Sequence, residues 1–319
     1  MNSVFDTFYK IVLKFNRTIA VIGVPIAIIL TVFVLLIVTV SAGFIFRSLR
    51  VTRKQKGIIE KQKALVDKKN IQITDSITYA LTIQESILPR GEQFKNAFGD
   101  FFILYLPKDI VSGDFYWIKN INGSALLSAV DCTGHGVPGA FMSLHGFNHL
   151  EHIVNEKKIL SPGAILDELN KAVVESLRQE EGSDLVKHGM DMGLLRYDRA
   201  GQKIIFSGAK NNMFIVSANS TTELKADRMS VGNKFGKKFT EQSADVQKGD
   251  MVYLFSDGYT DQKGGPGNKR FQVTPFKALL KSISNENGAE QNKILHDTFV
   301  SWKGDHEQVD DVLVIGVRI

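Results

Sequence analysis

Residues 125–143 read ALLSAVDCTGHGVPGAFMS, and this stretch decides the fold. A short apolar run, residues 125–130, has the composition of a β-strand and is followed at once by Asp131. Glycines then interrupt the chain before the apolar residues take up helical spacing from residue 137. The stretch therefore predicts a strand, an acidic residue at its end, a tight turn and a helix.

Beyond this stretch, residues 91–319 alternate between short apolar runs and segments with helical spacing. Further strands are expected at 101–106, 115–118, 189–197, 203–206, 213–216, 251–255 and 312–319. Further helices are expected at 165–177, with Ser161 and Pro162 as a starting signal, and at 274–283 and 291–302. Connections of hairpin length indicate antiparallel pairing, so the domain is expected to be α+β, with sheets and helices in separate layers.

Acidic residues stand at the ends of four of these predicted strands. They are Asp114, Asp131, Asp257 and the pair Asp310–Asp311. Each alone would commonly be a turn or capping residue, but carboxylates gathered at one sheet edge would repel one another unless a cation neutralised them. Oxygen ligands without a Cys/His pairing suit Mg²⁺ or Mn²⁺ rather than zinc. The pattern predicts a hard-cation site, provided that the fold brings these strand ends together.

Five segments, taken in chain order, resemble one known family. They are 83–89 (IQESILP), 109–116 (DIVSGDFY), 131–143, 255–261 (FSDGYTD) and Asp310–Asp311. Together they are similar to the SpoIIE/RsbU-type branch of the PPM (PP2C-like) serine/threonine phosphatases, over about residues 75–319. The resemblance implies an αββα sandwich, two antiparallel sheets flanked by helices, with a two-metal site at one end.

The resemblance also implies roles for individual residues and for two divalent cations, Mn²⁺ or Mg²⁺. Asp131 would bridge both cations, and the carbonyl of Cys132 would bind one of them. Asp257 and Asp310 would bind the other, while Asp114 would reach the cluster directly or through water. Water activated by the cations would hydrolyse phosphoserine or phosphothreonine without a covalent phosphoenzyme. The substrate implied is a phosphorylated regulatory protein, first of all an anti-sigma-factor antagonist of the STAS type.

Four further residues carry separate hypotheses. Cys132 stands where the family often has Gly, and because only its carbonyl is needed, its side chain is expected to be a small buried hydrophobe. His135 is a candidate general acid for the leaving alkoxide. Asp191 begins a strand near the place where relatives hold a weaker third metal, with a structural role as the alternative. Asp311 is the lesser metal candidate of its pair.

The charge of the chain is unevenly distributed. The formal net charge is +5, but residues 47–69 hold nine Lys or Arg against two acidic residues, whereas residues 70–319 hold 27 basic and 31 acidic side chains. A nucleic-acid-binding domain needs positive charge on its folded surface, so the composition argues against DNA or RNA as a partner. A single cysteine excludes an internal disulfide.

Residues 18–46 contain no charged side chain and are dominated by Ile, Val, Leu and Phe. About 20 apolar residues span a bilayer, and this run is roughly twice as long as the apolar region of a signal peptide, which is the alternative. Nine cations follow the run and three precede it, so the positive-inside rule places the C-terminal side in the cytoplasm. The sequence predicts a single-pass inner-membrane protein with a cytoplasmic catalytic domain.

A helical connector is expected between the membrane segment and the domain. One heptad position is apolar over five repeats: Ile59, Val66, Ile73, Ala80 and Ile87. This repeat favours a homodimeric coiled coil, in which Asn70 and Gln84 would fix the register. The alternative, especially from residue 73 onward, is an amphipathic helix lying on its own domain. The expected domains are thus 1–47 (tail and transmembrane helix), 48–90 (connector) and 91–319 (phosphatase domain).

Other enzyme classes explain the motifs less well. Gly134-x-Gly136-x-x-Gly139 formally matches a dinucleotide-binding turn, but Pro138 interrupts it and a helix follows where a parallel strand is needed. A cysteine-phosphatase loop starting at Cys132 would need Arg at position 138. A membrane histidine kinase would need a phosphoacceptor His on the connector, and residues 47–90 contain none. A catalytically inactive membrane-tethered interaction module is the alternative that stays open, followed by a nucleotide-binding membrane kinase.

Overall fold

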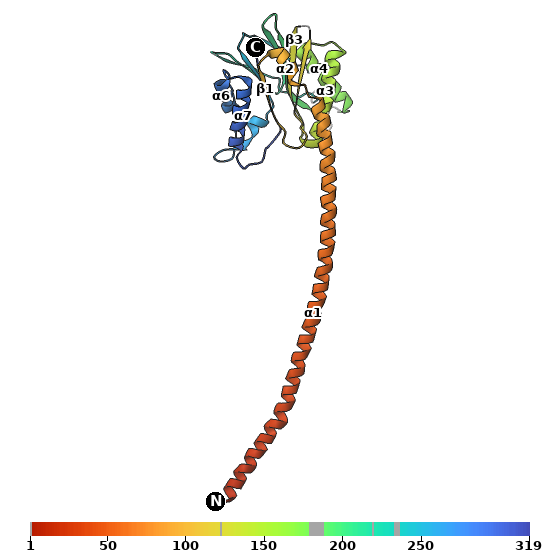
Figure 1. Ribbon diagram of the computed structural model, residues 1–319, viewed down its shortest axis with the longest axis vertical. Helices are drawn as coiled ribbons and strands as arrows, with labels where there is room; N and C mark the ends of the chain where they lie inside the picture. The colour runs from red at the N-terminus through yellow and green to blue at the C-terminus, as the bar shows by residue number, and fades with distance from the viewer. Residues whose placement is uncertain (1, 122, 179–187, 219, 233–236) are drawn as a thin grey trace. The chain divides into compact units, whose positions relative to one another are not determined.

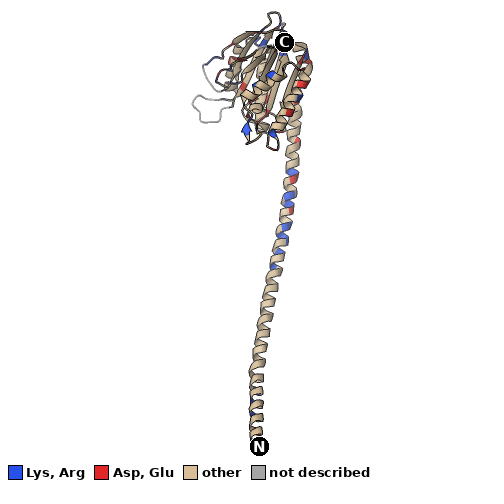
Figure 2. Ribbon diagram, turned by 90° about the vertical axis from the view of Figure 1, so that its left-hand side faces the viewer, with Lys and Arg blue, Asp and Glu red and all other residues tan. Residues whose placement is uncertain are grey.

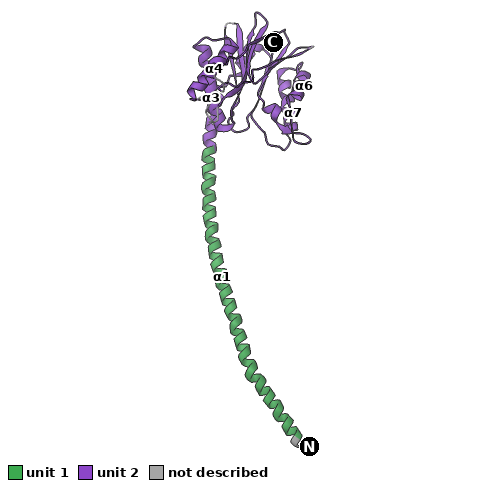
Figure 3. Ribbon diagram, turned by 180° about the vertical axis from the view of Figure 1, so that it is seen from behind, with its two compact units in different colours: residues 1–73 green, residues 74–319 purple. Residues whose placement is uncertain are grey.

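The computed structural model describes residues 2–121, 123–178, 188–218, 220–232 and 237–319. The chain divides into two compact units, Met1–Ile73 and Thr74–Ile319 (Figure 3). The second unit thus begins before residue 91, where the sequence places the domain boundary. The predicted domain limits stay a prediction.

Helix α1 (Asn2–Ile87) contains both the apolar run and the connector without a break. Almost every described side chain of residues 18–46 is exposed, and the most apolar window of 18 residues has a mean hydropathy of 3.2. Among the described residues, this helix is long and apolar enough to cross a membrane. Figure 2 shows the Lys and Arg residues gathered along α1 after the apolar run. An apolar helix and a helical connector ahead of the domain are therefore confirmed, whereas the orientation across a membrane stays a prediction.

Two five-stranded antiparallel sheets form the centre of the second unit. The first sheet contains, in spatial order, β1 (Phe101–Leu106), β12 (Val312–Arg318), β9 (Met251–Phe255), β6 (Met213–Val216) and β7 (Thr221–Leu224). The second contains β2 (Phe115–Ile121), β3 (Ser124–Cys132), β4 (Met190–Asp198), β5 (Lys203–Ala209) and β8 (Gln242–Asp245). A separate ribbon is formed by β10 (Lys263–Gly264) and β11 (Lys269–Arg270).

Helices cover the outer face of each sheet (Figure 1). The helices of this unit after α1 are α2 (Gly91–Phe98), α3 (Gly136–Asn155), α4 (Pro162–Ser176), α5 (Gly258–Asp261), α6 (Val273–Ile283) and α7 (Gly288–Lys303). One apolar core lies between the second sheet and α3 and α4, a second between the two sheets, and a third between the first sheet and α6 and α7. This confirms the predicted αββα sandwich.

Strand β3 shows how the sequence produces these layers. Side chains alternate across a strand, so Leu126 and Val130 reach the core under α3 and α4. Leu127 and Ala129 reach the core between the sheets. Because both faces are buried, every residue from Ala125 to Val130 except Ser128 is apolar, and Asp131 follows near the end of the strand. The core under α3 and α4 and the core between the sheets thus fix β3, and with it the position of Asp131.

Candidate active site

The predicted aspartates come from strand ends of both sheets. In the second sheet, Phe115 pairs with Val130 across β2 and β3, which places Asp114 beside Asp131. In the first sheet, Phe255 pairs with Val314 across β9 and β12, so Asp257 lies near the residues that precede β12. The fold therefore brings together residues that are separated by up to two hundred positions in the chain.

Glycines allow the loops of the site to touch through their main chains. A Cβ atom on Gly113 or on Gly139 would collide with the carbonyl oxygen of Gly134. The loop before Asp114, the turn after Asp131 and the first turn of α3 are thereby held against one another. In the same way, a Cβ on Gly258 would collide with the Asp311 carbonyl, which locks the turn after β9 against the start of β12.

Burial and mutual repulsion raise the pKa values of the aspartates. Burial and then the charge of Asp131 raise the pKa of Asp114 well above its usual range, although a hydrogen bond from Ser256 works in the opposite direction. Burial followed by the charges of Asp257 and Asp310 does the same to Asp131.

The aspartates of the first sheet follow the same rule. Burial and then Asp261 and Asp310 raise the pKa of Asp257 to about 6. The pKa of Asp310 is raised mainly by burial. Asp131 acts on Asp114, and Asp257 and Asp310 act on Asp131, so these four aspartates are linked into one electrostatic group.

The last pair of aspartates divides into two different environments. Asp311 is 2% exposed, and its two carboxylate oxygens accept hydrogen bonds from the backbone N–H groups of Lys108 and Gly113, both at 2.7 Å. Asp310 is only half-buried and accepts a hydrogen bond from the Asp311 N–H at 2.9 Å. Asp311 therefore braces the loop that carries Asp114, and its oxygens are already engaged.

His135 lies at the rim of this group, directly before α3. Its Nδ1 is 2.6 Å from Asp109 Oδ2, and its Nε2 is 3.0 Å from Lys108 Nζ. An ammonium can only donate, so Nε2 accepts from Lys108 while Nδ1–H is donated to Asp109. Lys108 and His135 both lower the pKa of Asp310, which shows that this pair faces the aspartates.

Asp191 and Cys132 occupy the second sheet next to Asp131. Asp191 is the direct partner of Asp131 across β3 and β4, and it forms an ion pair of 3.0 Å with Lys210. Cys132 is 4% exposed in the core under α3 and α4. Burial, followed by the charge of Asp131, raises the pKa of its thiol well above the usual value. A protonated, buried thiol is no nucleophile, so a cysteine mechanism does not fit.

The donor set fits hard divalent cations. Oδ2 of Asp114 is buried and has no hydrogen-bond partner among the described residues, and a buried carboxylate oxygen without a partner is costly unless a cation compensates it. In the described part of the chain, no group of three or more His, Cys, Asp or Glu side chains lies close enough together to hold a metal ion as it stands. The aspartates thus interact electrostatically without forming a ready-made set of ligands. The metal ligands predicted from the sequence stay a prediction.

A glutamine from α1 supports the site in a way that the sequence did not reveal. Gln84 is 1% exposed, donates to the Ser112 carbonyl at 2.6 Å and to Ser143 Oγ at 2.9 Å, and accepts from the Ser112 N–H at 3.0 Å. Gln84 therefore clamps the residue two positions before Asp114. It lies on its own domain rather than at a dimer seam, as in the amphipathic alternative.

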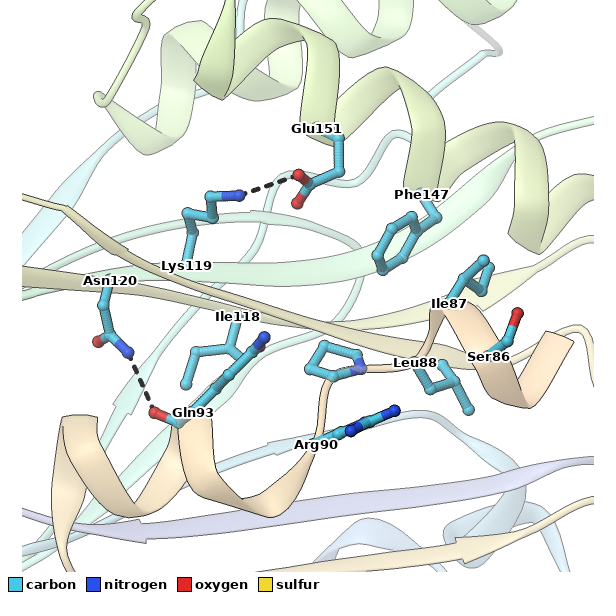
Figure 4. Close-up of a pocket in the computed structure, with 11 residues that line it drawn as sticks. Ser86, Ile87, Leu88, Arg90, Gln93, Ile118, Lys119, Asn120, Phe147 and Glu151 are labelled. Carbon is cyan, nitrogen blue, oxygen red and sulfur yellow. Dashed lines mark hydrogen bonds and ion pairs between the residues drawn. The ribbon is translucent and has the colours of Figure 1, made fainter. Parts of the chain in front are cut away.

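A cavity of about 440 Å³ lies where α1 ends, between α2, β2 and α3. Figure 4 shows Lys119 pointing toward Glu151, with which it forms an ion pair of 3.0 Å, and Asn120 donating to the Gln93 carbonyl at 3.1 Å. Glu151 also accepts from the Trp117 indole at 2.7 Å. None of the aspartates of the site lines this cavity, so it is separate from the electrostatic group.

Comparisons with known proteins agree with this geometry. Residues 122–319 match the family described as Stage II sporulation protein E (SpoIIE). Phosphoserine phosphatase RsbU of Bacillus subtilis (strain 168) is 23% identical over 251 residues, which cover 77% of this chain and 71% of RsbU. These likenesses confirm the resemblance drawn from the motifs.

Two solved structures are similar to the second unit. The SiaA-PP2C domain of Pseudomonas aeruginosa has a TM-score of 0.72 at 31% identity, over 78% of this chain and 98% of that one. The PP2C phosphatase domain of SpoIIE from Bacillus subtilis, solved with a fragment of its regulatory domain, has a TM-score of 0.56 at 19% identity, over 69% and 62%. The second likeness concerns the fold alone, whereas the first extends to the sequence.

Proposed function

This chain belongs to the SpoIIE family and is a phosphatase of the PP2C type, and from that premise we propose that it hydrolyses phosphoserine or phosphothreonine on a regulatory protein with Mn²⁺ or Mg²⁺. The observation that carries the proposal is the group of four aspartates whose pKa values are raised by burial and by one another. Such a group favours a state in which cations offset its charge.

We assign the metal ligands to the residues that carry the motif. Asp131 would contribute to holding both cations, and the carbonyl of Cys132 would help to hold one of them. Asp257 and Asp310 would hold the other, and Asp114 would contribute its unpartnered oxygen directly or through water. When bound, the cations lower the pKa of a water molecule and offset the charge of the phosphoryl oxygens.

We assign His135 as the general acid that protonates the leaving alkoxide. A serine alkoxide is a poor leaving group and needs a proton, whereas an aryl oxide does not. Asp109 fixes the imidazole through Nδ1, so that Nε2 stays directed at the rim beside Lys108. For His135 to carry that proton at Nε2, the Lys108 ammonium from which Nε2 accepts must first turn away or pass its own proton to the ring.

The ligand assignment is tested by Mn²⁺-dependent release of phosphate from a phosphoprotein. Asp131→Asn and Asp257→Asn should each lower the rate by more than the roughly 10–100-fold that loss of an outer-shell partner of a metal costs. Asp245→Asn, at an exposed position of β8, is the matched control and should keep the wild-type rate. Full activity of Asp131→Asn would contradict the assignment.

The His135 assignment is tested by changing the leaving group. His135→Ala should lose about 100-fold or more on phosphopeptides, because general acid catalysis contributes that much, and little on p-nitrophenyl phosphate. Asp109→Asn should show the same pattern more weakly. An equal loss on both substrates would assign His135 to the support of the site instead.

For the substrate, we propose a phosphorylated anti-sigma-factor antagonist of the STAS type. The similarity to the protein named phosphoserine phosphatase RsbU supports a phosphoserine protein as substrate. The full chain should release phosphate from a phosphorylated STAS-domain protein much faster than from free phosphoserine. Equal rates on both would indicate that the protein surface of the substrate is not recognised.

We also propose that residues 18–46 anchor the protein in the inner membrane, with residues 48–319 in the cytoplasm. The apolar composition of α1 and the basic residues that follow it support this orientation. Green fluorescent protein fused after residue 319 should fluoresce, whereas a periplasm-dependent alkaline phosphatase at that position should be inactive. The opposite pair of results would reverse the orientation.

Finally, we propose that a dimer through the connector regulates the site. The exposed heptad positions Ile59, Val66 and Ile73 support pairing, and Gln84, further along α1, offers a route to the loop of Asp114. Replacing residues 1–69 by a dimeric zipper, or by a strictly monomeric helix, should give two different rates. Equal rates would show that dimerisation does not control the phosphatase rate.

A further inference from the structure

Two histidines on α3, outside the aspartate group, face each other. His145 and His149 are four residues apart and therefore share one face of the helix. Their Nε2 atoms are 3.2 Å apart, and their rings meet nearly at right angles, with centroids 4.4 Å apart. Ser176 Oγ, at the end of α4, lies 2.7 Å from His145 Nε2. Three polar atoms thus converge between the two helices.

The separation of the two nitrogens matches the bite of a transition metal. A tetrahedral cation that binds imidazole nitrogens at about 2.0–2.1 Å holds two of them about 3.3 Å apart. Two histidines at positions i and i+4 of a helix are the arrangement that binds zinc in metalloproteases. We propose that His145 and His149 bind a cation of the Zn²⁺, Ni²⁺ or Cu²⁺ class through their Nε2 atoms, with water or Ser176 Oγ beside it.

The protonation of the pair suits this role. Burial lowers the pKa of both imidazoles, and the charges of His145, His152 and Lys157 lower that of His149 further. Both rings are therefore neutral at neutral pH, and each can carry its proton on Nδ1 so that the Nε2 lone pair is free for an ion. Ser176 Oγ donates to the Ala172 carbonyl at 2.6 Å, so toward His145 it can only accept: without an ion, His145 Nε2–H donates to it, and a bound cation would take the place of that hydrogen and leave the ring proton on Nδ1.

The site differs in chemistry from the aspartate group. Imidazole nitrogen favours Zn²⁺, Ni²⁺ and Cu²⁺, whereas carboxylate oxygen favours Mg²⁺ and Mn²⁺. Both histidines are half-buried, so an ion from solvent can reach them. A cation held there would tie α3 to the end of α4 on the outer face of the second sheet. The competing interpretation is that the two rings only share a proton and link the helices by hydrogen bonds.

Copper electron paramagnetic resonance separates these interpretations. The probe is Cu²⁺, one equivalent, added to the full chain in detergent, prepared without a polyhistidine tag and with excess Mg²⁺ to occupy the carboxylates. The spectrum should show hyperfine coupling to two imidazole nitrogens. Coupling to oxygen ligands only, or to a single nitrogen, would overturn the proposal, and this result depends on no variant.

Variants then locate the site. His145→Gln and His149→Gln keep a polar side chain but remove the nitrogen ligand, and each should weaken Ni²⁺ binding in calorimetry by at least the roughly 10–100-fold seen on loss of a metal's outer-shell partner. His152→Gln, on the same helix but paired with Glu156 at 3.0 Å, is the matched control and should bind as the wild type does. Unchanged affinity in both test variants would refute the assignment.

Discussion

Asp114 and Asp311 are both 2% exposed, yet their surroundings differ in kind. The two oxygens of Asp311 accept backbone N–H groups at 2.7 Å, whereas Oδ2 of Asp114 has no hydrogen-bond partner in the described part of the chain. The charge of Asp131 also raises the pKa of Asp114 after burial has done so. Burial of a carboxylate alone therefore does not indicate function. A carboxylate with both oxygens hydrogen-bonded holds loops together, whereas one with an unpartnered oxygen beside other charges marks a candidate cation site.

The largest effect on stability is expected at the satisfied carboxylate. Asp311→Asn replaces one acceptor oxygen by a donor, so the N–H of Lys108 or of Gly113 loses its partner. Hydrogen bonds to charged groups contribute about 1.5–3 kcal/mol each, and the free energy of unfolding should fall by about 3 kcal/mol. Denaturation followed by the fluorescence of Trp117 and Trp302 measures this. Asp305→Asn, exposed, is the control, and lost activity at unchanged stability would make Asp311 a metal ligand.

The unsatisfied carboxylate should behave in the opposite way. In Asp114→Asn, a neutral amide removes repulsion from Asp131, so the stability of the metal-free protein should not fall. Mn²⁺ affinity, measured by calorimetry, should fall by roughly 10–100-fold, the range seen when a residue that hydrogen-bonds to a metal ligand is removed. If stability fell as far as in Asp311→Asn, the contrast between the two aspartates would disappear.

A smaller effect is expected at the glutamine that holds the loop of Asp114 from outside. Gln84→Ala leaves the buried Ser112 N–H and carbonyl without their side-chain partner, which should cost about 1–2 kcal/mol of unfolding free energy. Phosphatase activity should fall as well, because the loop loses its clamp. Glu85→Ala, at the exposed neighbouring position, should change neither quantity.

The smallest effect is a dependence on pH. Burial, Asp261 and Asp310 raise the pKa of Asp257 from 3.8 to about 6. A carboxyl whose pKa is raised in the folded state stabilises the fold at pH values below its unfolded pKa, and this contribution is lost as the pH rises through about 6. The metal-free wild type should therefore lose more thermal stability between about pH 5 and pH 8 than Asp257→Asn does. Identical slopes would mean that the repulsion is screened by solvent.

Strands with two buried faces were predictable from the sequence. The predictions for 101–106, 213–216 and 251–255 coincide with β1, β6 and β9. Short continuous apolar runs bounded by turn residues are typical of buried strands. The polar edge strands β7 (TTEL) and β8 (QSAD) were not predicted, since they bury little and show no apolar alternation. Helix α2 was missed because two buried side chains, Phe94 and Ala97, are all that anchor it.

The chemistry of the site was predictable in part. Acidic residues at strand ends pointed to a shared site, and the structure places Asp114, Asp131, Asp257 and Asp310 within one electrostatic group. The brace at Asp311 could not be predicted, because its partner Lys108 is 203 positions away. A glutamine on a heptad is equally consistent with a dimer seam and with a buried clamp, so the role of Gln84 needed the tertiary structure.

The main chains at Gly113, Gly134 and Gly139 touch so closely that no side chain fits between them. A methyl group added at Gly113 or Gly139 would push the loops of the candidate site apart without changing the charge of the protein. Gly113→Ala would thus provide an inactive variant that can still bind its partner proteins in the cell. Comparing it with the wild type would separate what the protein does by turnover from what it does merely by being present.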